Sequence, residues 1–273
     1  MIRARKISGA LGAEIEGVDL ARPLAKADFA EVKRLWFEHL VIFFRNQNLN
    51  EKQYMAFAGQ FGEPVEYPLV KGVAGYPKII EVKKLEHERV AFGGVWHTDT
   101  AYLERPPMAS MLLAREVPPQ GGDTLFANMY LAFESLSPSL QKLLSGLKAV
   151  NSSTKADASK TREDRIKTDG AQKSDFVAEH PVVRTHPETG RKALYVNAGH
   201  TVRFVGWTEE ESAPLLKFLF DFQTRPEFTC RFSWQPGSIA LWDNRCAQHN
   251  PVNDYHGYRR VMHRITLGGD VPR

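Results

Sequence analysis

The sequence of 273 residues predicts a mainly β protein, a sandwich or jelly roll with helical decoration. Many short apolar runs rich in β-branched and aromatic residues are separated by turn residues, and such runs are typical of strands. Only a few stretches show the spacing of amphipathic helices. The alternation of strand and helix that marks Rossmann-like folds is absent, as are the P-loop, GxSxG and HExxH motifs.

The first part of the chain combines short strands with two helices. Apolar residues recur at helical spacing from 29 to 40, which predicts an amphipathic helix. The apolar run Val41–Phe44 that follows predicts a buried strand. A second helix is expected to start at Asn50, with Gln53 three residues on completing the cap, and to stop at Gly62.

The next part reads as strands separated by loops. Residues 64–94 are interrupted by glycine and proline, with Lys78–Val82 as a strand, and loops of this kind often shape a pocket. Met108–Leu113 is a further apolar strand, and Gly121–Phe126 marks a tight turn into another. Residues 131–147 contain two short helical patterns.

The composition changes at residues 151–179, where charged and hydroxylated residues dominate and apolar ones are scarce. A solvated insertion explains this stretch, and so does a mobile lid over a pocket. Because no linker or repeat divides the sequence, we expect one domain spanning residues 1–273, with this stretch as its lid or insertion.

The last part of the chain returns to strands around one helix. Val182–Thr185 and Ala193–Val196 flank a turn and predict a hairpin. Thr208 and Glu211 form a capping box before an apolar helical pattern. Three more strands are expected, over Phe228–Trp234, Ser238–Trp242 and Arg259–Leu267.

Composition narrows the function classes. With 42% hydrophobic and 25% charged residues the chain is globular, and its net charge of +4 (pI near 9.0) comes from dispersed side chains. That balance favours small anions as partners, without nucleic acid. The two cysteines, Cys230 and Cys246, indicate no disulfide framework, so we expect a soluble cytoplasmic protein with no membrane segment.

His97 and Asp99 stand two residues apart within Val95–Thr100. In an extended strand these positions point to the same side, so both side chains could bind one metal ion. His249, far along the chain, is a third candidate ligand. Two histidines and one carboxylate make the facial triad of non-haem iron(II) oxygenases.

Five stretches carry a resemblance to a known family: Trp96–Asp99, Gly121–Thr124, His180–Pro187, Trp242–Arg245 with His249, and Arg259–Arg264. They resemble, in the family's order, the motifs of the taurine dioxygenase (TauD/TfdA) family, which also includes 2,4-dichlorophenoxyacetate and dichlorprop dioxygenases and alkylsulfatases. The resemblance runs from about Ile7 to the C-terminus. It implies a double-stranded β-helix, a jelly roll like that of cupins, and a dioxygenase dependent on Fe(II), 2-oxoglutarate and O2.

The resemblance also implies roles for single residues. The iron ligands would be His97, Asp99 and His249. Thr124 and Arg260 would hold the distal carboxylate of 2-oxoglutarate, a task that suits the planar, always charged guanidinium. Arg264 would meet the anionic group of the substrate. If the segment is a strand, Arg260 and Arg264 face the same side.

The pocket departs from the taurine enzyme, which has a histidine and a tyrosine where this chain has Tyr67 and Val70. An asparagine of that enzyme is replaced by Gly93, and a phenylalanine by His200. The polar groups that would meet the amine of taurine are thus largely lost. Tyr67, Leu69 and Val70 offer a more apolar wall, which disfavours taurine as the substrate.

The expected reaction is hydroxylation of a small organic anion with an apolar body, of the aryloxyalkanoate, sulfonate or alkyl sulfate type, giving succinate and CO2. The family resemblance also implies a homo-oligomer, a dimer or tetramer. Two alternatives stay open: a jelly-roll hydrolase or isomerase that uses a metal without 2-oxoglutarate, and a metal-stabilised binding protein. The clamp formed by Thr124 and Arg260 argues against the hydrolase, which has no need of it.

Overall fold

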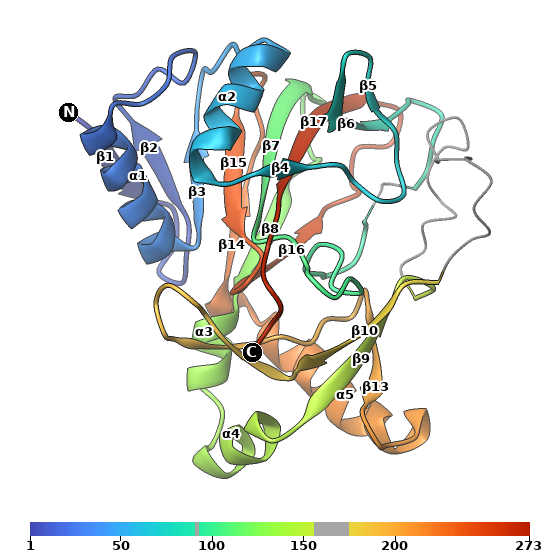
Figure 1. Cartoon of the computed structure of the whole chain (residues 1–273). Helices are drawn as coiled ribbons and strands as arrows, with labels where there is room; N and C mark the ends of the chain where they lie inside the picture. The colour runs from blue at the N-terminus through green and yellow to red at the C-terminus, as the bar shows by residue number, and fades with distance from the viewer. Residues whose placement is uncertain (91–92, 156–174) are drawn as a thin grey trace.

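Two facing β-sheets form the centre of the molecule in the computed structural model, which describes residues 1–90, 93–155 and 175–273 (Figure 1). The larger sheet contains, in spatial order, β1 (Arg3–Lys6), β2 (Ala13–Glu16), β3 (Val41–Phe44), β15 (Ile239–Asp243), β7 (Ala109–Glu116), β17 (Arg260–Leu267), β6 (Tyr76–Lys84) and β5 (Gly72–Val73), and β4 (Pro64–Val65) pairs with β17. The smaller sheet contains β14 (Thr229–Phe232), β8 (Thr124–Asn128) and β16 (Ala247–Pro251). The predicted mainly β fold is confirmed.

The alternation of side chains along β3 shows how the layers pack. Val41 and Phe43 lie between the two sheets, where Phe43 stacks on Phe232 of β14 with ring centroids 3.9 Å apart. Ile42 and Phe44 belong to the second apolar cluster, on the outer face of the larger sheet. The run is continuously apolar because both of its faces are buried.

Two helices cover that outer face, α1 (Lys26–His39) and α2 (Glu51–Phe61) (Figure 1). The predicted cap of α2 is present, because Asn50 accepts from the Gln53 backbone and the Gln53 side chain accepts from the Asn50 backbone. Both helices are therefore where the apolar spacing and the cap placed them.

The remaining elements lie at the end of the molecule away from α2 and β5, at the bottom of Figure 1. They are α3 (Met129–Glu134), α4 (Pro138–Ser145), α5 (Glu209–Gln223), the 3-10 helix η3 (Pro226–Phe228), the sheet of β10 (Val177–Pro181), β9 (Lys148–Ser152) and β13 (Thr201–Phe204), and the hairpin of β11 (Val183–Thr185) and β12 (Lys192–Leu194). The predicted hairpin and the predicted helix after Thr208 are both present.

The ends of the polar stretch 151–179 are strands, since β9 and β10 pair with Asn151 opposite Ala178. Most of the stretch for which a lid or an insertion is predicted, residues 156–174 of 151–179, lies outside the described residues. Among the helices of the described residues, none has the length and apolar character needed to cross a bilayer.

One expectation about the metal motif is corrected, and one strand beside it was not predicted. His97 does not belong to a full strand: it forms an isolated antiparallel bridge with His249, and Asp99 lies in a turn. The positive φ angles of Gly93 (+74°) and Thr100 (+42°) leave the extended region on both sides, so a longer strand is excluded. The strand β16 was not expected, because its sequence is polar and ends in proline.

Candidate metal and co-substrate site

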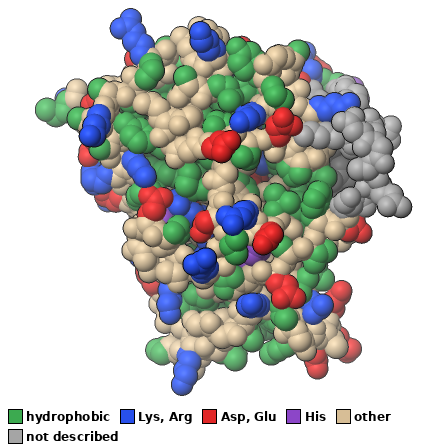
Figure 2. Space-filling view, viewed as in Figure 1, with side chains coloured by type: hydrophobic (Ala, Val, Ile, Leu, Met, Phe, Trp, Pro, Cys, Tyr) green, Lys and Arg blue, Asp and Glu red, His purple; other side chains and the backbone are tan. Residues whose placement is uncertain are grey.

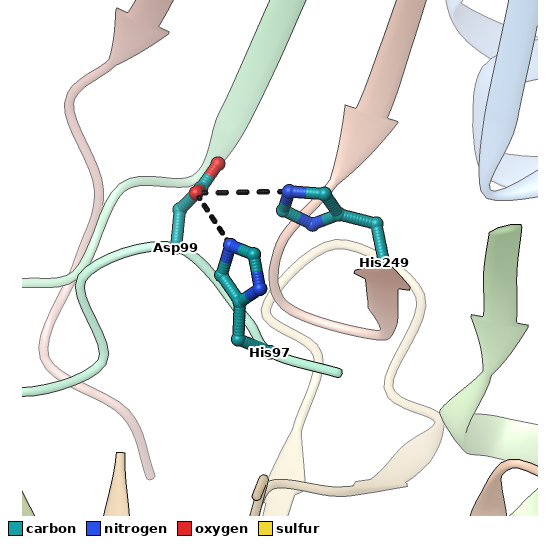
Figure 3. Close-up of side chains that lie close together, drawn as sticks. All are labelled: His97, Asp99 and His249. Atoms are coloured by element: carbon teal, nitrogen blue, oxygen red, sulfur yellow. Dashed lines mark ion pairs between the residues drawn. The ribbon is translucent and has the colours of Figure 1, made fainter. Parts of the chain in front are cut away.

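His97, Asp99 and His249 meet between the sheets (Figure 3). Asp99 Oδ1 lies 3.6 Å from His97 Nε2 and 3.9 Å from His249 Nε2, and one ligand atom from each residue lies within 4.8 Å of the others. All three side chains are buried. Two nitrogens and one carboxylate oxygen converge on one point, which fits a divalent transition metal with open coordination positions.

The backbone fixes the two imidazoles relative to each other. His97 and His249 exchange both of their backbone hydrogen bonds, at 3.0 and 2.9 Å, so their rings lie side by side with centroids 4.2 Å apart. His97 Nδ1 donates to the Val95 carbonyl at 2.7 Å. This bond places the ring proton on Nδ1 and leaves the Nε2 lone pair for a metal.

Asp99 is oriented by a chain of hydrogen bonds that starts in the larger sheet. Ser110 of β7 donates to Asp99 Oδ2 at 2.5 Å, and Asn244 Nδ2 donates to the Ser110 hydroxyl at 3.0 Å. Trp242 Nε1 donates to the Asn244 side-chain oxygen at 2.9 Å. The chain occupies Oδ2, so Oδ1 is the oxygen left to face the two imidazoles.

Arg264 contributes the main positive charge beside this carboxylate. Its Nη2 lies 3.1 Å from Asp99 Oδ1 as a buried ion pair. Burial alone would raise the pKa of Asp99, but Arg264, followed by His249 and His97, holds it well below its usual value. Burial, and then the neighbouring His97, lowers the pKa of His249. The site therefore presents an ionised carboxylate and a neutral imidazole, the forms that bind metals.

A second group of residues, Thr124 of β8, Trp234 after β14 and Arg260 of β17, lies close together. Trp234 Nε1 donates to Thr124 Oγ1 at 3.0 Å, and the Arg260 guanidinium lies over the Trp234 ring, 5.8 Å from its centroid. Arg260 is 5% exposed, and its Nε and Nη2 find no hydrogen-bond partner among the described residues. A buried cation with unused donors beside a threonine hydroxyl fits a carboxylate ligand.

Gly122 lets the chain approach Arg260 closely. Its φ is +70°, and a Cβ there would lie 3.2 Å from the Tyr255 ring and 3.3 Å from Arg260 Cδ. The Gly121–Thr124 motif thus turns tightly against the arginine before entering β8.

The pocket residues expected from the sequence lie around the triad. Tyr67 and Val70 form a small buried cluster with Ile80, and Leu69 packs against it. Arg264 Cζ lies 4.9 Å from the centroid of the Tyr67 ring, so this apolar cluster adjoins the ion pair with Asp99. One wall of the site is therefore mostly apolar.

His200 and Gly93 lie next to His97. The rings of His200 and His97 are 5.8 Å apart, and Tyr102 packs edge-on against His200 at 5.0 Å. Burial, with a smaller effect of His97, lowers the pKa of His200 to about 3, so this imidazole is neutral. A Cβ on Gly93 would lie 3.0 Å from His97 Cε1.

A second cluster, formed by His186, Asp243 and Cys246, has the composition of a metal site. Its side chains form hydrogen bonds within the fold instead. The His186 ring accepts from the Glu188 and Thr189 backbones at Nδ1 and donates to Asp243 at 3.0 Å. Asp243 also accepts from Arg245 at 2.8 and 2.7 Å. These hydrogen bonds use both nitrogens of His186 and both oxygens of Asp243 within the fold.

Several residues of the site were not found from the sequence: Tyr102, Ser110, Trp234 and Asn244. Each reaches the site only through pairing or packing with a distant segment, which a linear motif does not reveal. Asn244 alone had a signal, because it stands in the Trp242–Arg245 motif.

The chain is similar to known proteins along nearly its whole length. The family model described as "Taurine catabolism dioxygenase TauD, TfdA family" matches residues 3–266. An alkylsulfatase of Acinetobacter baylyi is 37% identical over 99% of this chain and 86% of its own length. A solved taurine dioxygenase from Burkholderia xenovorans superposes with a TM-score of 0.85, with 38% identity over 99% of this chain and 90% of that one.

A third relative was solved with ligands. The structure of AAD-2 in complex with Mn(II) and N-oxalylglycine gives a TM-score of 0.82, with 28% identity over 100% of this chain and 99% of that one. Both folds are therefore the same along their whole length. The chain belongs to the TauD/TfdA family of dioxygenases.

Proposed function

We propose that this enzyme hydroxylates a small organic anion with an apolar body. Alkyl sulfates are the substrate class that we favour most, followed by sulfonates and aryloxyalkanoates. The family supplies the reaction class: a dioxygenase that uses Fe(II), 2-oxoglutarate and O2. One substrate C–H becomes C–OH, while 2-oxoglutarate is oxidised to succinate and CO2. Bound Fe(II) would supply the activation of O2 that couples these two oxidations.

The metal would be held by the facial triad of His97, Asp99 and His249. The structure supports this role through the three convergent donor atoms and two hydrogen bonds that orient them, from Ser110 to Asp99 and from His97 to the Val95 carbonyl. Thr124 and Arg260 would bind the distal carboxylate of 2-oxoglutarate, so that its keto acid end points to the triad.

The observation that carries the proposal is the spacing of two buried arginines on β17. Arg260 and Arg264 lie on the same face of the strand, one beside Thr124 and the other beside Asp99. With one cation on each side of the metal triad, the site can bind two anionic ligands, the co-substrate and the substrate. A hydrolase or isomerase working with the metal alone has no use for Arg260.

The wall of Tyr67, Leu69 and Val70 supports an apolar body for the substrate, whose anionic group would be held by Arg264. The similarity to an alkylsulfatase agrees with this choice. Hydroxylation of the carbon that carries a sulfate ester gives an unstable hydroxy ester. Its C–O bond breaks, its hydroxyl loses the proton, and an aldehyde and sulfate are released.

The test is succinate formation from 2-oxoglutarate in the presence of Fe(II) and O2, with alkyl sulfates, sulfonates, aryloxyalkanoates and taurine offered in parallel. Turnover stimulated by an alkyl sulfate, with one aldehyde and one sulfate per succinate, is the expected result. Stimulation by taurine alone would contradict the assigned pocket. Absence of both succinate formation and 2-oxoglutarate binding would contradict the site as a whole.

We also propose that the enzyme is cytoplasmic, acts on small molecules and assembles as a dimer or tetramer. Both cysteines, Cys230 and Cys246, are free and buried, which suits a reducing compartment. On the face seen in Figure 2, basic and acidic side chains are interspersed, which suits small anions better than nucleic acid. Light scattering of the purified protein tests the assembly.

A further inference from the structure

Lys84, at the end of β6, is a buried cation to which the reaction so far gives no role. Lys84 is 3% exposed, and its Nζ has no hydrogen-bond partner in the described part of the chain. The ammonium lies 4.5 Å from the centroid of the Tyr255 ring, which provides a cation–π contact and no counterion. A lysine this deeply buried is uncommon unless something pairs with it.

The register of the sheet places Lys84 beside the proposed co-substrate clamp. Lys84 pairs with Arg260 across β6 and β17, and Ile80 pairs with Arg264 four residues away. Since paired residues project to the same face, Lys84 and Arg260 both point between the sheets. Tyr255 is near both, because its ring contacts the Lys84 ammonium and, like Arg260, borders the position that a Cβ on Gly122 would take.

The carboxylates near Tyr255 and Arg260 are those of Glu88, Asp123 and Asp254, and each accepts a hydrogen bond from another group; Glu88 accepts from the Leu85 backbone at 2.5 Å. Asp123 accepts from Arg231 at 2.6 Å, and Asp254 accepts from the Gly122 backbone at 2.8 Å and pairs with Arg231 at 3.4 Å. Two cations thus stand opposite each other on neighbouring strands, each with unused donors. Like charges directly opposite each other destabilise a sheet, and their burial adds to that cost. An anion bound between Lys84 and Arg260 would therefore stabilise the pair.

We propose that Lys84 is a second cation for the distal carboxylate of 2-oxoglutarate, acting together with Arg260 and Thr124. This inference rests on the proposed function, because it deepens the same co-substrate site. A carboxylate has two oxygens, so the guanidinium and the hydroxyl can bind it while the ammonium adds a further donor. Lys84 then sets the preference for a dicarboxylic over a monocarboxylic 2-oxoacid.

The test compares two ligands on the Mn(II)-loaded enzyme by calorimetry. 2-Oxoglutarate has the distal carboxylate, while 2-oxovalerate keeps the keto acid end and lacks it. Lys84→Met should raise the Kd of 2-oxoglutarate about tenfold, as expected for one charge-assisted hydrogen bond, and leave that of 2-oxovalerate within about twofold. Lys84→Arg keeps the charge and should retain most of the preference.

Lys83→Met is the matched control, because Lys83 is the next residue of the same strand, points to the opposite face and pairs with Glu81. It should change neither Kd. If Lys84→Met weakens both ligands equally, or neither, Lys84 only packs on Tyr255 and the inference is wrong. If the wild-type enzyme binds no 2-oxoglutarate, the proposed function itself fails.

Thermal unfolding adds a readout that a structural role would not give. Removal of an unpaired buried charge should raise the Tm of the ligand-free Lys84→Met protein, and it should reduce the increase in Tm that 2-oxoglutarate produces. A lower ligand-free Tm with an unchanged ligand effect would contradict the inference. Lys84→Gln allows both measurements should the methionine variant fail to fold.

Discussion

Arg264 Nη2 lies 3.1 Å from Asp99 Oδ1, the same oxygen that faces the two imidazoles of the triad. The cation proposed for the substrate anion thus contacts a proposed metal ligand directly. Since both residues are buried, the charge of Asp99 is shared between Arg264 and any metal bound to the site. With the proposed roles, substrate binding and metal binding would be coupled through this one carboxylate.

Arg264→Gln tests the substrate role. Loss of a charge-assisted contact of about 1.5–3 kcal/mol should raise the substrate Kd roughly 10–100-fold. The Kd of 2-oxoglutarate should stay within about threefold, since Arg260 remains. Metal binding should not weaken, because the variant removes a cation that competes for Asp99. Calorimetry measures all three constants.

Arg259→Gln provides the comparison, since Arg259 precedes β17 and its half-exposed side chain pairs with Glu116. It should leave all three constants unchanged. An equal loss of substrate and 2-oxoglutarate affinity in Arg264→Gln would refute the separate roles of the two arginines on β17.

Ser110→Ala tests the orientation of Asp99. The variant removes the hydroxyl that donates to Asp99 Oδ2 and accepts from Asn244. Loss of such a supporting hydrogen bond typically costs 10–100-fold in metal affinity, so a weakening of about tenfold is expected. Titration with Mn(II) followed by electron paramagnetic resonance measures it. Unchanged metal affinity with a lowered Tm would show that Ser110 stabilises the fold and does not affect metal binding.

Gly93→Ala tests the space beside His97. A methyl group there meets His97 Cε1 at 3.0 Å, and the positive φ costs a further 1–2 kcal/mol or so. Gly75→Ala separates the two effects, because Gly75 has a similar φ of +78° and an open environment. Both variants should lose stability in chemical denaturation, and only Gly93→Ala should also lose metal affinity. Equal metal affinity in both would show that His97 moves freely aside.

Elements set by local interactions could be predicted from the sequence, and elements set by contacts with distant segments could not. The helix after Asn50 and the strand Val41–Phe44 were predictable, because capping and apolar spacing act within a few residues. The strand expected at His97 was wrong, since the tertiary bridge to His249 and flanking positive φ angles override the local pattern.

The same distinction holds within the site. The triad and the arginines of β17 stand in contiguous motifs, so a family resemblance could indicate them. Ser110 and Lys84 lie in ordinary strand sequences, and only the pairing of β7 and β6 with β17 brings them to the site. Sheet register is set by the whole fold, so their positions could not be derived from the chain alone.

Asp243→Asn tests whether the second cluster stabilises the fold or binds a metal. Asp243 is fully enclosed and accepts from Arg245 and His186. Burial alone would raise the pKa of this carboxyl, but Arg245 lowers it below its usual value. The variant leaves a buried guanidinium without its main partner, so the free energy of unfolding should fall by about 3–5 kcal/mol. Metal content should not change.

The contribution of Asp243 to the free energy of unfolding decreases at acidic pH. Because the pKa is lower in the folded state, the contribution of Asp243 is fully present above the unfolded pKa of about 4 and is lost as the pH falls below it. Asp243→Asn should therefore flatten the acid side of the stability curve in urea unfolding. Asp221→Asn removes an exposed pair with Lys217 and should cost under about 0.5 kcal/mol. An Asp243→Asn protein that keeps its stability and loses bound metal would instead make this cluster a metal site.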